Sequence, residues 1–236
     1  GLGKRMNSEL PKVLHKINNK PMIVHVLERS IELNVNRIII IVGKYYDIIK
    51  STISEYISRE IMITKIEFII QEEPLGTGDA ILCCKNRLSN FKEKVTKVCI
   101  LSGDVPLIKT ETINLMLSRL NYSNILVSKV DDPFGYGRII LKDNKIDKIV
   151  EEKDCSIEER KVDLINSGIY SFNIGILVKF IDKIDNNNAN NEYYLTQIFD
   201  LLSKNNYNTG FTYLNNNTEI LGVNTVEQLK SMENLI

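Results

Sequence analysis

The chain has 236 residues, and its 30 basic and 30 acidic side chains cancel to a formal net charge of zero. This balance argues against a general nucleic-acid-binding surface but leaves room for a local basic pocket. No apolar run approaches the roughly 20 residues that span a membrane, so we expect no membrane partner. The four cysteines lack paired metal-ligand spacing and disulfide density, which favours free thiols in a reducing cytoplasm.

The first half of the chain predicts alternating helices and strands. A helix is expected to start near Pro21, because apolar residues recur at helical spacing from there to Ile31. The apolar run Arg37–Gly43 predicts a strand buried on both faces of a parallel sheet. The later elements expected in this half are a helix over 45–57, a strand over 66–70, a helix over 77–88, a strand over 95–101, a helix over 110–120 and a strand over 125–130.

After Val130 the pattern changes and predicts a small β-rich lobe. Expected there are strands over 137–141, 145–150 and 165–172, helices over 174–184 and 193–202, a strand over 219–223 and a C-terminal helix. Strands that alternate with helices of this length predict right-handed βαβ units. We therefore expect an α/β fold, with a mostly parallel sheet and helices on both faces, in a single domain over 1–236.

Polar and glycine motifs follow several of the predicted strands. They are Gly43, Gln71, Ser102-Gly103-Asp104 and Asp131-Asp132. In open α/β sheets, ligands bind in the crevice at the carboxyl ends of the strands. Gly76-Thr77-Gly78 opens a predicted helix, where unpaired N–H groups favour anions or hydrogen-bond acceptors. These positions together predict a phosphorylated ligand.

The opening segment, Gly1 to Lys12, has two interpretations. Its two glycines would let backbone N–H groups approach a phosphate, and Lys4, Arg5 and Lys12 would supply positive charge. A solvated basic tail would have the same composition. Taken alone, the segment leaves both open.

The motifs in register resemble one family. The matching segments are 1–6 with 10–14, 71 with 75–78, 103–107, 131–133 with 135–139, 149–151 with 153–154, 165–169, 186–189 with 192–196, and 222–224. In order and spacing they resemble the N-terminal uridylyltransferase domain of the bacterial bifunctional N-acetylglucosamine-1-phosphate uridylyltransferases. These are sugar-nucleotide pyrophosphorylases, so the resemblance implies a Rossmann-like nucleotidyltransferase fold.

The reaction that the resemblance implies joins UTP to N-acetylglucosamine 1-phosphate, giving UDP-N-acetylglucosamine and pyrophosphate. A sugar-phosphate oxygen would attack the α-phosphorus in line, without a covalent enzyme intermediate. Catalysis would then consist mostly of positioning and of cations that stabilise the phosphate charge.

The resemblance also implies roles for the residues of the phosphate site. Arg5 would hold the leaving phosphates, and Lys12 would lie near the α-phosphate and the sugar phosphate. Gly1 matches a nucleotide-binding glycine. Asp104, which also matches the nucleotide site, would bind Mg²⁺ together with Asn224, because hard oxygen ligands suit this ion.

For the base and the sugar, the resemblance implies two further groups. Gln71, Gly76 and Thr77 would bind the uracil. The positions that match the N-acetylglucosamine pocket are Gly137, Glu151, Asn166 and Thr196. Tyr193 and Tyr194 could wall that pocket or pack in the core, and neither is given a role.

Some residues in these segments are interpreted as solvent-facing. Asp131, Asp132 and Glu152 could form carboxylate pairs, but nothing in the implied reaction needs a general acid–base pair. The Asn-rich stretch 186–191 is expected to be a surface loop.

The chain departs from the family pattern in three ways. The family has a hydrophobic strand before its first glycine, so we expect a first strand to be missing before Gly1. Ser102 replaces a tyrosine. The sequence stops at Ile236 without the β-helix that carries the acetyltransferase, so we expect no acetyl-CoA chemistry and leave the oligomeric state open.

Alternative functions stay open at this point. The chain could use another sugar 1-phosphate, such as glucose 1-phosphate, or dTTP in place of UTP. It could also be a sugar-nucleotide-binding module without activity. Asn186–Ala189 and Glu192–Thr196 favour N-acetylglucosamine, because they match the bifunctional family.

Overall fold

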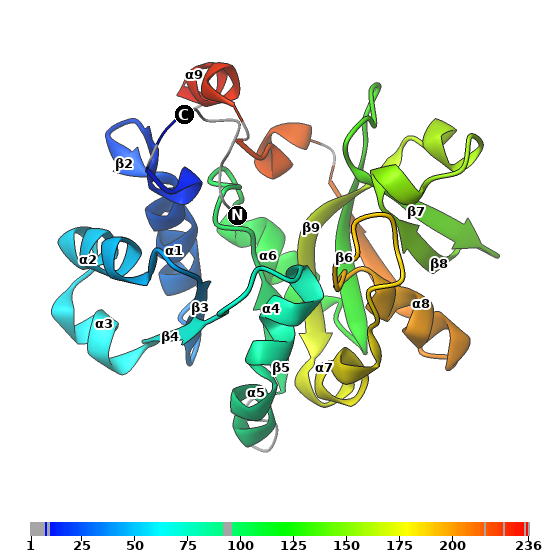
Figure 1. The fold of residues 1–236 in the computed structure, drawn as a ribbon, viewed down its shortest axis with the longest axis horizontal. Helices are drawn as coiled ribbons and strands as arrows, with labels where there is room; N and C mark the ends of the chain where they lie inside the picture. Colours follow the sequence, from blue (N-terminus) through cyan, green and yellow to red (C-terminus); the bar gives the residue numbers. More distant parts are fainter. Residues whose placement is uncertain are drawn as a thin grey trace. The chain divides into compact units, whose positions relative to one another are not determined.

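The computed structural model describes residues 8, 10–91, 96–214, 216–223, 225–233 and 235 (Figure 1). Backbone contacts divide the chain into two compact units. Unit 1 comprises Gly1–Pro74, Leu101–Thr112 and Thr218–Ile236, and unit 2 comprises Leu75–Ile100 and Ile113–Asn217. Gly1, Arg5 and Asn224 from the predicted site lie outside the described residues.

Unit 1 contains two parallel strands and the helices packed beside them. Its elements are η2 (Lys12–Leu14), β1 (Lys16–Ile17), β2 (Lys20–Pro21), α1 (Met22–Glu32), β3 (Ile38–Val42), α2 (Tyr46–Tyr56), α3 (Arg59–Thr64), β4 (Ile66–Ile70) and α9 (Val226–Glu233). Strands β3 and β4 pair in parallel, with Ile38 opposite Ile66 and Val42 opposite Ile70. The residues that follow the two strands, Gly43 and Gln71, therefore lie at one edge, as predicted.

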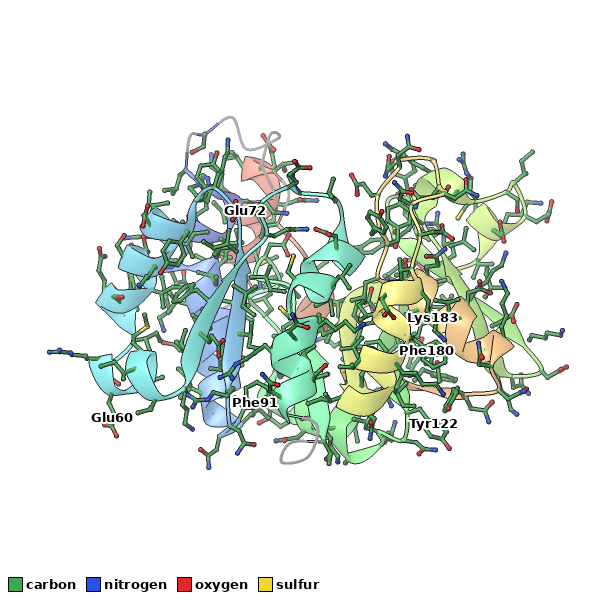
Figure 2. The ribbon with its side chains drawn as sticks, turned by 60° about the horizontal axis from the view of Figure 1, so that its bottom comes forward. Glu60, Glu72, Phe91, Tyr122, Phe180 and Lys183 are labelled. Carbon is green, nitrogen blue, oxygen red and sulfur yellow. The ribbon has the colours of Figure 1, made fainter. Side chains whose placement is uncertain are left out.

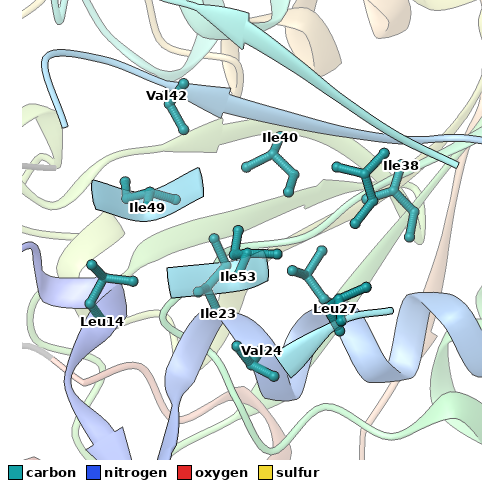
Figure 3. Packing of buried hydrophobic residues seen from close by; sticks show 11 residues of the cluster. Leu14, Ile23, Val24, Leu27, Ile38, Ile40, Val42, Ile49 and Ile53 are labelled. Carbon is teal, nitrogen blue, oxygen red and sulfur yellow. The ribbon is translucent and has the colours of Figure 1, made fainter. Parts of the chain in front are cut away.

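The core of unit 1 comes from these elements (Figure 3). Alternate residues of β3 are buried, and they pack with one face of α1, one face of α2 and Leu14 of η2. Ile53 of α2 and Val24 of α1 are fully buried. Burying an aliphatic side chain of this size contributes about 1.5–3 kcal/mol, so the apolar stripes predicted from the sequence hold η2 in place through Leu14.

Unit 2 is built around one long strand, β9 (Leu164–Asn173). Its elements are α4 (Thr77–Cys83), α5 (Lys85–Phe91), β5 (Lys97–Ile100), β6 (Ser123–Lys129), β7 (Gly137–Lys142), β8 (Lys145–Val150), η3 (Glu152–Asp154), η4 (Glu159–Lys161), α7 (Ile174–Phe180), η5 (Ile181–Lys183), α8 (Gln197–Lys204) and β10 (Thr209–Tyr213). The sheet order is β10-β6-β9-β7-β8, with β5 also on β9. Helix α6 (Thr110–Ser118) and η6 (Asn217–Ile220) contain points where the chain passes between units.

An aromatic cluster lies beside the sheet of unit 2. Tyr207 packs edge-on against Tyr122, with ring centroids 5.0 Å apart, and against Phe180 at 5.5 Å. Lys183 Nζ lies 4.8 Å from the Phe180 ring centroid (Figure 2). Edge-on ring pairs and cations over a ring face are both favourable contacts, so these side chains fasten α7 and η5 to the segments that flank the sheet.

The sheet of unit 2 is less parallel than predicted. The pair β6–β10 is parallel, whereas β5, β6 and β7 each pair antiparallel with β9. The parallel expectation came from apolar runs and from the alternation of strands with helices, and neither feature fixes which strand is the neighbour of which. The hairpin from β7 to β8 turns through Asp143 and Asn144, both with positive φ, a turn that joins antiparallel neighbours.

Most predicted elements are present, with local differences. The helix expected over 77–88 divides at Cys84 into α4 and α5, and the helix expected from residue 193 begins at Gln197. Strand β10 was missed, because Gly210 inside it weakens the strand pattern.

The strand expected over 219–223 was wrong, because this segment begins with the end of η6. Glu219 is buried there and accepts hydrogen bonds from the Thr112 hydroxyl (2.7 Å) and the Lys109 N–H (3.2 Å). None of the helices among the described residues is long and apolar enough to cross a membrane.

Candidate active site

Two of the predicted phosphate-site residues meet in unit 1. The Lys12 ammonium forms an ion pair with the Asp104 carboxylate, although the two residues come from distant parts of the chain. Lys12 is the first residue of η2, and Pro11 before it holds the extended backbone from which η2 starts. Both side chains keep some access to solvent, at 14% and 23% exposure. A cation and a carboxylate are thus held together where an incoming ligand can reach them.

The backbone around Asp104 is fixed from two sides. A Cβ on Gly103 would lie 3.4 Å from Val13 Cγ1, so this turn packs closely on η2. On the other side, the Val223 N–H donates to the Asp104 carbonyl oxygen at 3.1 Å. Val223 is the residue directly before Asn224 in the sequence. The chain segment that leads to the second predicted metal ligand is therefore bonded to the backbone of the first.

Within the described residues, no three His, Cys, Asp or Glu side chains gather as metal ligands. A divalent ion at Asp104 would need most of its ligands from other groups. Mg²⁺ suits this arrangement, because it commonly keeps several waters and takes one or two protein oxygens together with substrate phosphates.

Gln71, predicted to bind the base, follows β4 directly. Its N–H donates to the Val42 carbonyl oxygen at 2.7 Å, which extends the β3–β4 ladder by one bond. A Cβ on Gly43 would lie 3.4 Å from the Gln71 carbonyl oxygen. The backbone of Gln71 is therefore held by its hydrogen bond to Val42 and by close packing against Gly43.

The other two base-site residues lie in unit 2, where the backbone of Tyr193 and Leu195 packs against them. The Tyr193 N–H donates to the Leu75 carbonyl oxygen at 2.8 Å, and the Gly78 N–H donates to the Tyr193 carbonyl oxygen at 2.7 Å. The Leu195 N–H donates to the Thr77 hydroxyl at 3.1 Å. The Gly78 N–H, which was expected to be available for a ligand, is thus bonded within the protein. The Thr77 hydroxyl accepts from Leu195 and can still donate its own proton.

We expect Gly76→Ala to lower the free energy of unfolding by about 2–6 kcal/mol. Gly76 has φ +126°, and an added Cβ would lie 2.5 Å from the Tyr193 carbonyl oxygen. Backbone strain of about 1–3 kcal/mol would add to an overpacking cost of about 1–3 kcal/mol. Urea unfolding measures the loss. The matched control is Gly135→Ala, which has φ +85° but meets nothing within 4 Å; equal losses for both variants would contradict the close approach of Tyr193.

The four residues predicted for the sugar pocket come together in unit 2. A Cβ on Gly137 would lie 3.4 Å from Glu151 Oε2 and 3.5 Å from the Cβ of Asn166. Gly137 is paired with Asn166 across β7 and β9. The Thr196 hydroxyl donates to Glu151 Oε1 at 2.9 Å. The result is one largely buried cluster of a carboxylate, an amide, a hydroxyl and a glycine backbone, which is the chemistry that binds sugar hydroxyls.

Tyr170, which the sequence gave no reason to select, orients one of these residues. The Asn166 amide nitrogen donates to the Tyr170 hydroxyl at 2.8 Å, and the Gly168 N–H donates to Asn166 Oδ1 at 3.1 Å. Because the Gly168 N–H can only donate, it fixes which end of the amide carries the oxygen. Burial, and then the nearby Glu151 charge, raise the pKa of Tyr170, so its hydroxyl stays protonated at neutral pH.

Glu151 is the titratable group of the cluster. Burial raises the pKa of its carboxyl, the Thr196 hydrogen bond opposes this shift, and the charges of Asp154 and Glu192 add to it. The folded protein therefore binds the Glu151 proton more tightly than the unfolded chain does. The stabilisation from this difference is complete below the unfolded pKa and is lost as the pH rises through the raised folded pKa.

We therefore expect Glu151→Gln to gain stability relative to the unmodified chain between pH 4 and pH 8. The gain should reach about 1.4 kcal/mol for each unit by which folding raises the pKa. Urea midpoints across that pH range measure it. Glu158→Gln, at a side chain with 80% exposure, is the control that should show no such trend. A gain that is independent of pH would contradict the assignment.

The Asn-rich stretch is a surface loop, but it is attached to the sugar cluster. Asn188 Oδ1 accepts from the Asn190 and Glu192 N–H groups, both at 3.2 Å, which folds the loop around one side chain. The Ala189 N–H donates to Asp154 Oδ1 at 2.8 Å. Since Asp154 belongs to η3, the loop is joined to the segment that directly follows Glu151.

Of the three carboxylates expected to face solvent, one behaves differently. Asp131 and Asp132 are exposed, and Asp132 accepts only from the nearby Phe134 N–H at 3.0 Å among its described hydrogen bonds. Glu152 instead forms an ion pair with Arg138 at 2.7 Å, and Arg138 is buried at 2% exposure. The expectation for Glu152 was wrong. The pairing of β7 with β8 brings Arg138 beside it, and the sequence did not show that contact.

The sequence pattern of the nucleotidyl transferase family matches residues 3–217. The chain belongs to this family. A family member from Acanthamoeba polyphaga mimivirus, named a probable UDP-N-acetylglucosamine pyrophosphorylase, is 42% identical over 100% of this chain and 92% of its own length. The bifunctional protein GlmU of Clostridium botulinum strain Eklund 17B is 40% identical over 100% of this chain. The chain spans 50% of the length of that relative.

Solved structures confirm the nucleotidyltransferase fold. A UDP-glucose pyrophosphorylase complexed with UDP-glucose superimposes with a TM-score of 0.75 at 18% identity, covering 100% of this chain and 94% of that one. A putative glucose-1-phosphate thymidylyltransferase from Bacillus anthracis gives a TM-score of 0.72 at 18% identity, covering 100% and 91%. These structures share the α/β fold predicted from the sequence.

Proposed function

We propose that this nucleotidyl transferase is a UDP-N-acetylglucosamine pyrophosphorylase, which transfers uridylyl from UTP to N-acetylglucosamine 1-phosphate and releases pyrophosphate. The observation that carries the proposal is the gathering of four polar or glycine residues from separate segments into one cluster, namely Gly137, Glu151, Asn166 and Thr196. The viral relative, similar along nearly its whole length, supports the choice of nucleotide and sugar.

In the proposed reaction, a phosphate oxygen of the sugar 1-phosphate forms a bond to the α-phosphorus of UTP. The bond from that phosphorus to the β-phosphate oxygen breaks, and the electron pair leaves with pyrophosphate. Lys12 would stabilise the charge around the α-phosphorus, and Arg5 would hold the leaving phosphates. Gln71, Gly76 and Thr77, with Gly1, would bind the nucleotide. No side chain needs to act as a nucleophile.

Mg²⁺ is proposed as the cofactor, with Asp104 and Asn224 as its protein ligands. Asp104 fits this role because it offers a hard, partly exposed carboxylate oxygen on a turn that is fixed by hydrogen bonding and packing. A bound Mg²⁺ would neutralise charge on the phosphate oxygens. Lys12 beside it would carry part of the same task.

Pyrophosphate release, measured across a panel of nucleotides and sugar phosphates, tests the proposal. We expect the highest kcat/KM for UTP with N-acetylglucosamine 1-phosphate, and no turnover without a divalent ion. A preference for glucose 1-phosphate or for dTTP would overturn the substrate assignment. Tight binding of UDP-N-acetylglucosamine without any turnover would instead identify a sugar-nucleotide-binding module.

A further inference from the structure

Arg138 is a buried guanidinium that the proposed reaction does not use. It is the second residue of β7 and is among the largest fully buried side chains. Its Nη2 donates to Glu152 Oε2 at 2.7 Å, and its Nη1 donates to the Tyr136 carbonyl oxygen. Its Nε has no hydrogen-bond partner among the described residues. Burying an ion pair costs desolvation free energy that hydrophobic packing would avoid, so a retained pair needs an explanation.

Glu152 joins this guanidinium to the loop before β7. Its Oε2 also accepts from the Gly135 N–H at 3.0 Å, and its Oε1 lies 4.0 Å from Arg160 Nε. The side chain of Glu152 is 18% exposed. Arg138 and Glu152 together therefore hold the backbone of Gly135 and Tyr136, the two residues directly before Gly137, against the start of η3.

Each member of the pair is the next neighbour of a residue in the sugar cluster. Arg138 follows Gly137 on β7, and Glu152 follows Glu151. Neighbouring residues of a strand point to opposite faces, so Arg138 lies on the face of β7 opposite to Gly137. In the ladder, Arg138 is paired with Val150, which directly precedes Glu151. The ion pair thus joins the two segments that carry Gly137 and Glu151, on the face of β7 opposite to Gly137.

We propose that the Arg138–Glu152 pair is a positioning device, which fixes the Glu151 carboxylate against Gly137 so that both can bind the hydroxyl groups of a sugar 1-phosphate. This inference rests on the proposed function. The two charges do not touch the sugar. They act through the backbone of their neighbours. They set the geometry of the sugar cluster and leave the nucleotide residues unchanged.

A purely structural role predicts a different outcome. If the pair only stabilised the fold, its loss would lower the melting temperature, and the two substrates would be affected alike once the protein was folded. A positioning role predicts weaker binding of the sugar phosphate alone, because Gly137 and Glu151 belong to the sugar cluster and not to the nucleotide site.

The experiment uses the whole chain and measures KM for each substrate separately, at a temperature where melting curves show every variant to be folded. Glu152→Gln keeps the shape and an acceptor oxygen but removes the charge. We expect its KM for N-acetylglucosamine 1-phosphate to rise on the order of tenfold, with the KM for UTP unchanged. Arg138→Lys, which keeps the charge but loses the two-pronged donor geometry, is the second variant and should shift the same KM.

The matched control is Glu158→Gln, which breaks a Glu–Lys pair at the surface in the same part of unit 2 and should change neither KM. Equal changes in both KM values, or no change, in folded Glu152→Gln and Arg138→Lys would overturn the inference. Failure of the proposed function has a separate sign, because the unmodified chain would then give no turnover. If it prefers another sugar 1-phosphate, the same comparison is made with that sugar, and the same selective rise is expected.

Discussion

Asp104→Ala should abolish divalent-ion-dependent turnover, with a loss of about 10³-fold or more, and leave the protein folded. A metal that neutralises phosphate charge contributes several kcal/mol to transition-state stabilisation, and each 1.4 kcal/mol is about tenfold in rate. The structural cost should be small, because Asp104 and Lys12 both retain some solvent access and such pairs contribute about 1 kcal/mol or less. Pyrophosphate release measures the first effect, and a melting curve measures the second.

The matched control for this variant is Asp163→Ala. Asp163 forms an ion pair with Lys129 at 3.2 Å, so its removal also leaves a lysine without its aspartate, but at an exposed surface of unit 2. Full activity is expected there. Asp104→Ala with undiminished turnover would remove Asp104 from the metal site, whatever the melting curves show.

Much of the fold could be predicted because burial leaves a simple mark on the sequence. The run from Ile38 to Val42 is apolar at every position, and it forms a parallel strand as predicted. Burial on both faces was expected, but only Ile38, Ile40 and Val42 are buried, while the two residues between them are partly exposed. Helix α1 was predicted from apolar residues at helical spacing, and most of these residues are buried as expected. Ile31 is only partly buried, however, and Val24 and His25 are buried as well. Strand pairing leaves no such mark, so a mostly parallel sheet was expected and the antiparallel pairing of β5 and β6 with β9 was not predicted.

The candidate site divides in a similar way. Gly137, Glu151, Asn166 and Thr196 were selected from motifs, and the structure brings them together. Their supporting residues could not be selected, because each acts through a contact between segments far apart in the sequence. An arginine in a strand is usually exposed, so nothing in the sequence indicated that Arg138 is buried. Its burial depends on the ion pair with Glu152, which the fold places beside it. The base-binding role of Gly76 stays a prediction, and the structure adds that a Cβ at this position would meet the backbone of Tyr193.

The opening segment now has a firmer interpretation at one of its positions. Arg5 and Gly1 lie outside the described residues, so their roles stay predictions. Lys12, by contrast, is paired with Asp104 on a short helix that the core residue Leu14 holds in place. A solvated tail would not hold its lysine against a carboxylate from another part of the unit, so Lys12 does not belong to such a tail, and its phosphate role stays a prediction.

Lys12→Met should change turnover and metal binding in opposite directions. Removing a charge aimed at the α-phosphate should lower kcat by about 10²–10³-fold, the usual effect of losing one stabilising donor. The same change frees Asp104 from a cation that competes for its carboxylate oxygen. The nucleotide-free protein should then bind Mn²⁺, used as a spectroscopic probe, about fivefold more tightly, which corresponds to a pair of about 1 kcal/mol.

Electron paramagnetic resonance of free Mn²⁺ measures the affinity without any need for turnover. Lys16→Met removes a nearby exposed positive charge and controls for the general field, so its Mn²⁺ affinity should match that of the unmodified chain. Lys12→Arg keeps the charge and should keep the weaker affinity. If Lys12→Met bound Mn²⁺ no more tightly than the unmodified chain, the lysine and the metal would not share Asp104. Both effects would follow from one ion pair, because the lysine proposed to stabilise the phosphate charge would also be the cation that the metal has to displace.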